Sequence, residues 1–287
     1  MKEINKVTVL GIGVLGSQIA YQTAYCDFDV VAYDIGEEAL RLAEERVLNL
    51  TATYKEQVKG ASIDKTDAAL KRITYQMDLG LTVAQADLVI EAVPEKIELK
   101  QDIYSRIGKL APAKAIFATN TSTLLPSDLM EYTGRPDRFL ALHFANQIWI
   151  RNTAEVMGTG KTDPKVYRTV VEFASAIGMV PIELKKEHPR YLLNSLLSPW
   201  LENALELVVD GVAEPETVDK TWRIATGAPT GPFQILDIVG LRTVCNIGAA
   251  GNDRQQRQAR FLKKKYIDKG KLGLESGQGF YSYTSMK

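Results

Sequence analysis

The sequence predicts an α/β domain built on a mostly parallel sheet, followed by a smaller all-α domain. Up to about residue 187, short continuous apolar runs alternate with longer helical patterns, which is typical of a sheet that helices cover on both faces. Beyond that point strand signals are few and helical signals many. The polar stretch 185–189 separates the two patterns, so we expect domains at 1–187 and 188–287.

Each expected strand is a short apolar run that ends at a glycine or a polar residue. In chain order these runs are 7–10, 29–34, 87–93, 115–119, 138–144, 154–157 and 179–184. Between the second and third runs, segment 37–72 carries apolar residues at helical spacing and is broken at Gly60. This pattern predicts a helical hairpin inserted into the sheet domain. Because a cofactor does not require such an insertion, we expect it to serve the substrate.

The second domain is expected to consist of helices. Helical spacing of apolar residues indicates helices over 192–209, 215–225, 236–250 and 253–269. We interpret the basic run from Arg254 to Lys265 as a solvated face or as part of a subunit contact.

The composition excludes several classes of protein. The 287 residues include 35 basic and 35 acidic side chains, and this balance argues against general binding to nucleic acid or to a membrane surface. No apolar run approaches the roughly 20 residues that span a bilayer, and we expect no signal peptide. Cys26 and Cys245 lie in no disulfide or metal motif, so we expect no metal site and a reducing cytoplasm.

A glycine motif follows the first expected strand. In Gly11-Ile12-Gly13-Val14-Leu15-Gly16, Gly11 permits a tight turn, Gly13 lets the backbone approach a pyrophosphate, and Gly16 allows close packing of helix on strand. Asp34 ends the second strand, where it would bind ribose hydroxyls and repel a 2′-phosphate. The simpler alternative is a glycine-rich turn beside an acidic strand end. The context favours a Rossmann-like domain that binds NAD rather than NADP.

Two histidines are candidates for proton transfer. His143 lies at the carboxyl end of its strand, where doubly wound sheets bind ligands, and Glu155 lies on a second strand-like run. If the two strands are adjacent, the carboxylate fixes the imidazole tautomer and leaves the other ring nitrogen to exchange a proton with substrate. A structural histidine is the alternative. His188 precedes a proline at the expected linker, so we interpret it as structural or exposed.

The segment Asn120-Thr121-Ser122-Thr123 also follows a strand. Its hydroxyl and amide groups can contact a ribose, the nicotinamide amide or a substrate oxygen. The same residues can instead cap a helix over 126–129, and spacing alone does not separate the two possibilities.

Nearly the whole chain resembles the L-3-hydroxyacyl-CoA dehydrogenase family, particularly its short bacterial 3-hydroxybutyryl-CoA dehydrogenase members. Besides the glycine motif and Asp34, the matching motifs are Glu91-Ala92-Val93-Pro94-Glu95 with Lys100, Asn120-Thr121-Ser122, His143-Phe144 with Asn146, Glu155, Pro189 with Asn194, Gly231-Pro232-Phe233 with Asp237, Gly240-Leu241, and the ending Gly277-Gln278-Gly279-Phe280-Tyr281-Ser282-Tyr283. Many motifs in the same order are more specific than any one of them.

The resemblance implies where the cofactor and partners bind. NAD would occupy the first domain, with Glu95 and Lys100 near the nicotinamide end and Asn120 near its ribose. The substrate would be a short acyl-CoA, as in fatty acid metabolism, and the hairpin would help to bind the CoA portion. Lys55 and Lys59 of the hairpin are candidates for a CoA phosphate, but solvated surface lysines are the simpler interpretation. Family members are usually homodimers joined through the helical domain.

The resemblance also implies catalytic roles. His143 would be the general base for alcohol oxidation and the general acid for ketone reduction, oriented by Glu155. Ser122 and Asn194 would hydrogen-bond the substrate around the reacting oxygen. Hydride passes between C3 of the substrate and the nicotinamide, while the protein supplies geometry and charge.

Several positions depart from the family pattern. Ala145 and Gln147 stand where the family usually has phenylalanine and proline, and Trp149 is a candidate to refill the lost ring. Arg190 replaces a glycine, and it either binds an anionic substrate group or points into solvent. Ser195 and Arg242 replace a usual arginine and aspartate. These departures leave open the acyl length and the requirement for CoA.

Two alternative functions follow from the superfamily. The first is an NAD-dependent dehydrogenase of a free 3-hydroxy acid, as gulonate dehydrogenases are, although Phe144 stands where those relatives tend to have proline. The second is a non-catalytic NADH-binding protein resembling lambda-crystallin. The joint presence of Ser122, His143, Glu155 and Asn194 argues against this second alternative.

Overall fold

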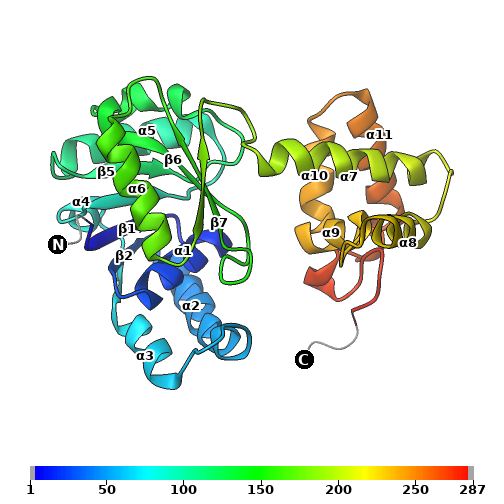
Figure 1. Ribbon diagram of the computed structural model, residues 1–287, viewed down its shortest axis with the longest axis horizontal. Helices are drawn as coiled ribbons and strands as arrows, with labels where there is room; N and C mark the ends of the chain where they lie inside the picture. Colours follow the sequence, from blue (N-terminus) through cyan, green and yellow to red (C-terminus); the bar gives the residue numbers. More distant parts are fainter. Residues whose placement is uncertain (1–3, 284–287) are drawn as a thin grey trace. The chain divides into compact units, whose positions relative to one another are not determined.

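The structure is a computed structural model that describes residues 4–283. It divides into two compact units, Met1–Leu192 and Leu193–Lys287, which we call the sheet unit and the helical unit (Figure 1). The domain boundary expected between residues 187 and 188 stays a prediction.

The sheet unit contains one eight-stranded sheet with the order β3-β2-β1-β4-β5-β6-β7-β8. Its strands are β1 (Lys6–Leu10), β2 (Asp29–Tyr33), β3 (Ile73–Gln76), β4 (Leu88–Glu91), β5 (Ile116–Thr119), β6 (Phe139–Phe144), β7 (Thr153–Gly158) and β8 (Val180–Leu184). Neighbouring strands are parallel except for β6 and β7, which are antiparallel. The strand order reverses between β1 and β4, which makes their carboxyl ends the expected ligand site.

Helices cover both faces of this sheet (Figure 1). They are α1 (Val14–Tyr25), α2 (Glu37–Gln57), α3 (Ile63–Lys71), α4 (Leu79–Val83), α5 (Ile97–Leu110) and α6 (Pro164–Ala176), with short 3₁₀ turns at Pro126–Asp128, Met130–Thr133 and Pro136–Arg138. Successive strand residues belong to different hydrophobic cores: Val89 packs on the side of α4 and α5, and Ile90 on the side of α1, α2 and α6. The predicted doubly wound α/β fold is confirmed.

The inserted hairpin is formed by α2 and α3. The helix α2 ends one turn before Gly60, whose φ of +81° lies in the left-handed region that favours glycine. Ser62 then begins α3, because its side chain accepts a hydrogen bond from the backbone N–H of Lys65.

One strand of the sheet was absent from the sequence-based prediction. The edge strand β3 has only Ile73 fully buried, and Tyr75 is half-buried. A four-residue edge strand with mixed polarity lacks the continuous apolar run by which the other strands were identified.

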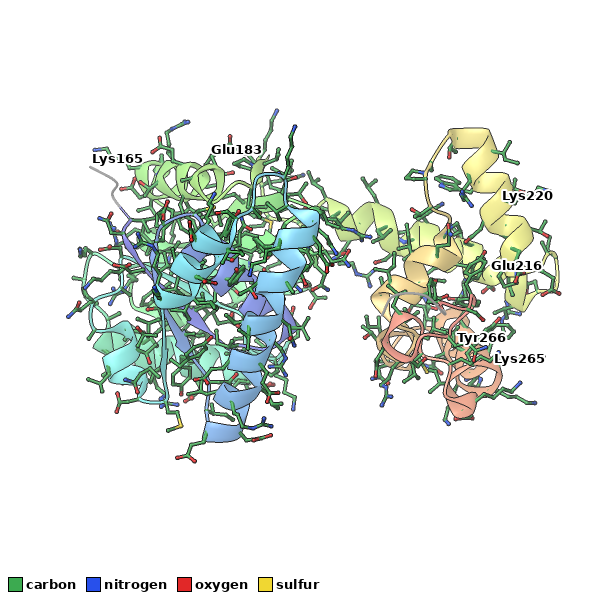
Figure 2. The ribbon with its side chains drawn as sticks, turned by 90° about the horizontal axis from the view of Figure 1, so that it is seen from below. Lys165, Glu183, Glu216, Lys220, Lys265 and Tyr266 are labelled. Atoms are coloured by element: carbon green, nitrogen blue, oxygen red, sulfur yellow. The ribbon has the colours of Figure 1, made fainter. Side chains whose placement is uncertain are left out.

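The helical unit contains only helices and short 3₁₀ turns among its described residues. Its elements are α7 (Leu193–Val209), α8 (Pro215–Thr226), α9 (Pro232–Val239), α10 (Leu241–Ala249) and α11 (Asp253–Lys265), with 3₁₀ turns at Ile267–Lys269 and Leu274–Ser276. Figure 2 shows Lys265 and Tyr266 where α11 ends, and Glu216 and Lys220 one turn apart on α8.

Two helix predictions in this unit are wrong in detail. The helix expected over 236–250 is two helices, α9 and α10, because Gly240 adopts φ +92° between them. The helix expected over 253–269 ends at Lys265 and is followed by a 3₁₀ turn. Apolar spacing continues through both breaks, so the periodicity alone did not reveal them.

The closing segment of the helical unit is held by a buried aspartate. Asp237 on α9 accepts hydrogen bonds from the backbone N–H groups of Phe280 and Tyr281 and from the Tyr283 hydroxyl, at 2.8–3.0 Å. A Cβ atom on Gly279 would lie 1.9 Å from the Asp237 carboxylate. The glycine in this terminal motif is therefore required by close packing against Asp237.

Candidate active site

The glycine motif forms a turn with an open face. Gly11 has φ +87°, and a Cβ atom there would lie 2.7 Å from the backbone oxygen of Ala92. A Cβ atom on Gly16 would lie 1.9 Å from the Gly11 oxygen, whereas one on Gly13 would meet no described atom within 4 Å. The first and third glycines thus allow tight packing, and the second leaves space for a ligand against the backbone.

The helix α1 begins at this open face. Gly13 is its N-cap, no described side chain caps its first turn, and that turn carries no acidic residue. Its first N–H groups and the helix dipole therefore favour an anionic ligand. The arrangement fits the pyrophosphate of a dinucleotide.

Asp34 lies beside the same turn. One carboxylate oxygen accepts the backbone N–H of Ile12 at 3.0 Å, and the other accepts that of Ile35 at 2.8 Å. Each oxygen retains a further acceptor position. The carboxylate is partly exposed, so it can accept ribose hydroxyls as the sequence predicted, but this role stays a prediction.

A buried ion pair lies behind the β4–β5 edge of the site. Glu91 accepts hydrogen bonds from the Lys100 ammonium at 2.6 Å and from the Thr119 hydroxyl at 2.8 Å. Burial raises the pKa of Glu91, and the neighbouring Lys100 charge opposes this shift. Because Lys100 is 1% exposed, its first partners are protein carboxylates, and its expected contact with the cofactor stays a prediction.

Glu95 holds the loop that follows β5. One of its oxygens accepts the backbone N–H groups of Ser122 and Thr123 at 2.9 and 3.0 Å, and it also contacts the Thr121 hydroxyl. Lys100 lies 3.2 Å from the other oxygen. Burial acts to raise the pKa of Glu95, but these hydrogen bonds and the lysine charge lower it overall. Glu95 therefore positions Ser122, a contact that the sequence analysis did not predict.

His143 and Glu155 face each other across the only described antiparallel strand pair. They are direct partners in the β6–β7 register, so their side chains lie on the same face of the sheet. His143 Nδ1 lies 2.9 Å from Glu155 Oε2, and Nε2 lies 3.2 Å from Ser122 Oγ. Both partners of the pair are about 95% buried. The structure thus brings together three of the four predicted catalytic residues.

The remaining predicted residues lie in different places. Asn120 Oδ1 accepts the backbone N–H of Phe144 at 2.9 Å and so joins the loop after β5 to the end of β6. Asn194 belongs to the helical unit, on α7, and its catalytic role stays a prediction. His188 is exposed, and its Nδ1 lies 2.7 Å from the carbonyl oxygen of Pro189.

Two neighbouring residues complete the surroundings of the pair. The Tyr191 ring stacks on the His143 ring with centroids 4.6 Å apart and an interplanar angle of 26°. The backbone N–H of Leu192 donates to Glu155 Oε1 at 2.8 Å. Neither contact was predicted from the sequence, where the available signal is an aromatic residue two positions after Pro189.

The departures from the family pattern have identifiable contacts. Trp149 packs against Tyr54, and its indole N–H donates to Gln57 on α2 at 2.7 Å, while its role as a substitute for the ring missing at Ala145 stays a prediction. Arg190 is exposed with φ +66°, and Arg242 lies 3.7 Å from Glu275.

Residues 4–283 show neither a metal site nor a membrane-spanning helix. No group of three or more histidine, cysteine, aspartate or glutamate side chains in this range is arranged to hold a metal ion. No helix in the same range has the length and apolar character needed to cross a bilayer.

The glycine turn at the reversal of strand order, with an acid at the end of β2, defines a dinucleotide-binding protein of the doubly wound class. Residues 6–188 match the 3-hydroxyacyl-CoA dehydrogenase NAD binding domain, and residues 191–283 match the C-terminal domain of the same family. The chain belongs to the 3-hydroxyacyl-CoA dehydrogenase family, whose members are NAD-dependent oxidoreductases. The predicted family, enzyme class and cofactor are confirmed.

The chain is similar to dehydrogenases that are named for CoA substrates and to a diketoreductase. A probable 3-hydroxybutyryl-CoA dehydrogenase of Deinococcus radiodurans is 32% identical, and the match covers 97% of this chain and 100% of that protein. The human mitochondrial hydroxyacyl-coenzyme A dehydrogenase is 33% identical, and the match covers 98% of this chain and 91% of the human protein. A solved structure of a diketoreductase, described as catalysing reactions of dicarbonyl compounds, is 63% identical with a TM-score of 0.95. The match covers 99% of this chain and 100% of the diketoreductase chain.

Proposed function

We propose that the protein interconverts a secondary alcohol and a ketone at the carbon β to a carbonyl group, with NAD as the redox partner. The observation that carries this proposal is the placement of His143 between Glu155 and Ser122. A carboxylate on one ring nitrogen and a hydroxyl near the other is an arrangement suited to proton transfer to or from a substrate oxygen.

The chain's own groups have separable roles in this reaction. Because Glu155 accepts the Nδ1–H of His143, the other ring nitrogen, Nε2, can take the alcohol proton in oxidation and return it in reduction. The Ser122 hydroxyl marks the position of the substrate oxygen, and Glu95 fixes the loop that carries it. The glycine turn and the start of α1 would hold the pyrophosphate of NAD, which would supply the hydride acceptor in oxidation and, as NADH, the hydride donor in reduction.

The first substrate candidate is a short acyl-CoA. Its support is the family membership of both domains and the names of the curated relatives. A 3-ketoacyl thioester presents two carbonyl groups in a 1,3 arrangement, which is the chemistry that the site recognises in this proposal.

The second candidate is a dicarbonyl compound without CoA. The 63% identity to a diketoreductase favours it, because this identity is nearly twice that of the CoA-dependent relatives. The departures at Ala145, Gln147 and Arg190 are compatible with it, since they lie close in sequence to His143 and Tyr191. The exposed positions of Lys55 and Lys59 provide no contact that requires a CoA phosphate.

The oxidation of NADH, followed by absorbance, tests the function and the candidates together. Acetoacetyl-CoA and pentane-2,4-dione should both be reduced, because both present the 1,3-dicarbonyl group. If kcat/KM for acetoacetyl-CoA exceeds that for pentane-2,4-dione by about tenfold or more, the CoA portion contributes to binding. A smaller ratio would favour the free dicarbonyl compound as the substrate. Failure of the folded, NADH-binding protein to reduce either compound would contradict the proposed function.

We further propose that the protein is a homodimer joined through the helical unit. Large apolar side chains are exposed on three of its helices: Leu196 on α7 (76%), Ile224 on α8 (74%) and Ile247 on α10 (64%). A subunit contact through the helical unit would bury these exposed apolar side chains.

A further inference from the structure

Two consecutive residues beside the His143–Glu155 pair have a strained backbone. Arg190 has φ +66° and Tyr191 has φ +58°, and both values lie in the left-handed region that disfavours residues with a Cβ atom. The first of these positions is occupied by arginine rather than by glycine, the residue that adopts this conformation without cost. Strain that persists beside a functional group suggests that the conformation itself is used.

The turn delivers two contacts to the pair from adjacent residues. Tyr191, which is fully buried, places its ring face against the His143 imidazole at 4.6 Å. Leu192 directs its backbone N–H at the Glu155 oxygen that does not face His143, at 2.8 Å. Both members of the pair are therefore held from the same side by one short segment.

We propose that Arg190–Leu192 is a positioning segment for the proton-transfer pair, and that the ring of Tyr191 stabilises the imidazolium that His143 becomes when it accepts the substrate proton. This inference rests on the proposed function. Tyr191 acts through His143, so it is a positioning residue rather than a catalytic one.

The physical basis is the charge distribution of the aromatic ring. The face of a phenol ring is electron-rich, so it stabilises an imidazolium more than a neutral imidazole. The charged groups near Tyr191 are the carboxylates of Glu95, Glu155, Glu91 and Glu187. Burial, followed by these carboxylates, raises the pKa of Tyr191 far above its ordinary value, so the ring stays neutral in the assay range.

Substitution of Tyr191 by phenylalanine or by leucine separates the effect of the ring from the effect of the hydroxyl. Tyr191→Phe keeps the ring and should leave kcat and its pH profile within about twofold of the wild type. Tyr191→Leu removes the ring and should lower kcat for alcohol oxidation by about tenfold. It should also move the acid limb of kcat to lower pH by about half a unit to one unit, because the imidazolium loses its stabilising face. NADH affinity should be unchanged in both variants.

Controls separate this inference from the proposed function. His188→Ala changes an exposed side chain near the segment while keeping Tyr191, so its pH profile should match the wild type. If Tyr191→Leu fails to fold, as judged by NADH binding, Tyr191→Met fills the space without a ring and should show the same shift. A wild-type profile in the leucine or methionine variant, or a shifted profile in Tyr191→Phe, overturns the positioning role. Full turnover by His143→Ala would instead overturn the proposed function itself.

Discussion

The imidazole of His143 contacts three different kinds of group. Glu155 accepts from one nitrogen, Ser122 lies near the other, and the Tyr191 ring covers one face. Each contact comes from a different part of the chain: a partner strand, a loop after β5, and the strained turn before α7. A single side chain therefore depends on three independent features of the fold for its chemistry.

Removal of this imidazole should affect turnover far more than cofactor binding. His143→Ala is expected to lower kcat by about 10²–10⁴-fold, the usual effect of losing a positioned proton-transfer group. NADH affinity, measured by fluorescence titration, should change little. The matched control is His188→Ala, which removes the other, exposed histidine and should retain wild-type turnover. The reverse pattern would show that the base has been wrongly assigned.

At the residue scale, the sequence predicted the partners that strands provide but not those that loops provide. Two strand-like runs twelve residues apart in sequence indicated that His143 and Glu155 could meet, and the antiparallel register brings them together. The contacts of Tyr191 and Glu95 depend on loop conformations, which no periodicity in the sequence reports. The left-handed backbone conformation of Arg190 could not be predicted either, because arginine, unlike glycine, does not favour that conformation.

At the scale of elements, the site depends on the way two loops are joined. The segment after β4 carries Glu95, the segment after β5 carries Ser122, and the carboxylate of the first accepts the backbone N–H groups of the second. The buried Lys100–Glu91 ion pair holds the base of the first segment. Loss of Lys100 would leave the buried Glu91 carboxylate without its ion-pair partner, so this pair constrains the position of the loop.

The junction between these loops should weaken in acid. Hydrogen bonds and the Lys100 charge lower the pKa of Glu95 below its ordinary 4.5, so its contribution to stability is present above that pH and is lost as the pH falls through the lowered value. Glu95→Gln should lower the free energy of unfolding at pH 7 by about 1 kcal/mol, because the amide keeps an acceptor but loses the charge. Urea unfolding at several pH values should show the two proteins converging in acid. A constant difference would contradict this account.

The strands were predictable where the sequence carries a continuous apolar run. Strands β1, β4, β5 and β6 are buried and appear as continuous apolar runs, whereas the edge strand β3 does not. Helix ends marked by Gly60 and Ser62 were also close to the prediction. The break at Gly240 was missed because leucine residues on both sides continue the apolar pattern.

At the scale of the whole molecule, functional side chains and exposed apolar side chains are distributed differently between the two units. The polar residues that we assign to chemistry and cofactor binding lie in the sheet unit, apart from Asn194. Both units expose large apolar side chains, but the smaller helical unit carries more of them for its length, among them Leu196 on α7, Ile224 on α8 and Ile247 on α10. This division is the basis for assigning subunit association to the helical unit.

Charge on the exposed apolar helices should therefore disrupt association. Leu196→Glu combined with Ile224→Glu is expected to convert a dimer to a monomer, because a carboxylate cannot be buried there without a partner. Sedimentation velocity over a range of concentrations measures the change. Leu81→Glu provides a control, since Leu81 is 67% exposed on the sheet unit and the variant should sediment like the wild type. A monomeric wild type would refute the proposed dimer.

The antiparallel pairing of β6 with β7 has a consequence for how such enzymes diversify. Side chains alternate between the two faces of a strand, so a slip of one residue in this pairing would turn Glu155 away from His143. The segment 145–152 that links the two strands carries no such constraint, and here it holds Ala145, Gln147 and Trp149. His143 and Glu155 are thus fixed relative to each other by the sheet, while three of the departures from the family pattern lie in the adjoining loop, where a change of side chain leaves that register intact.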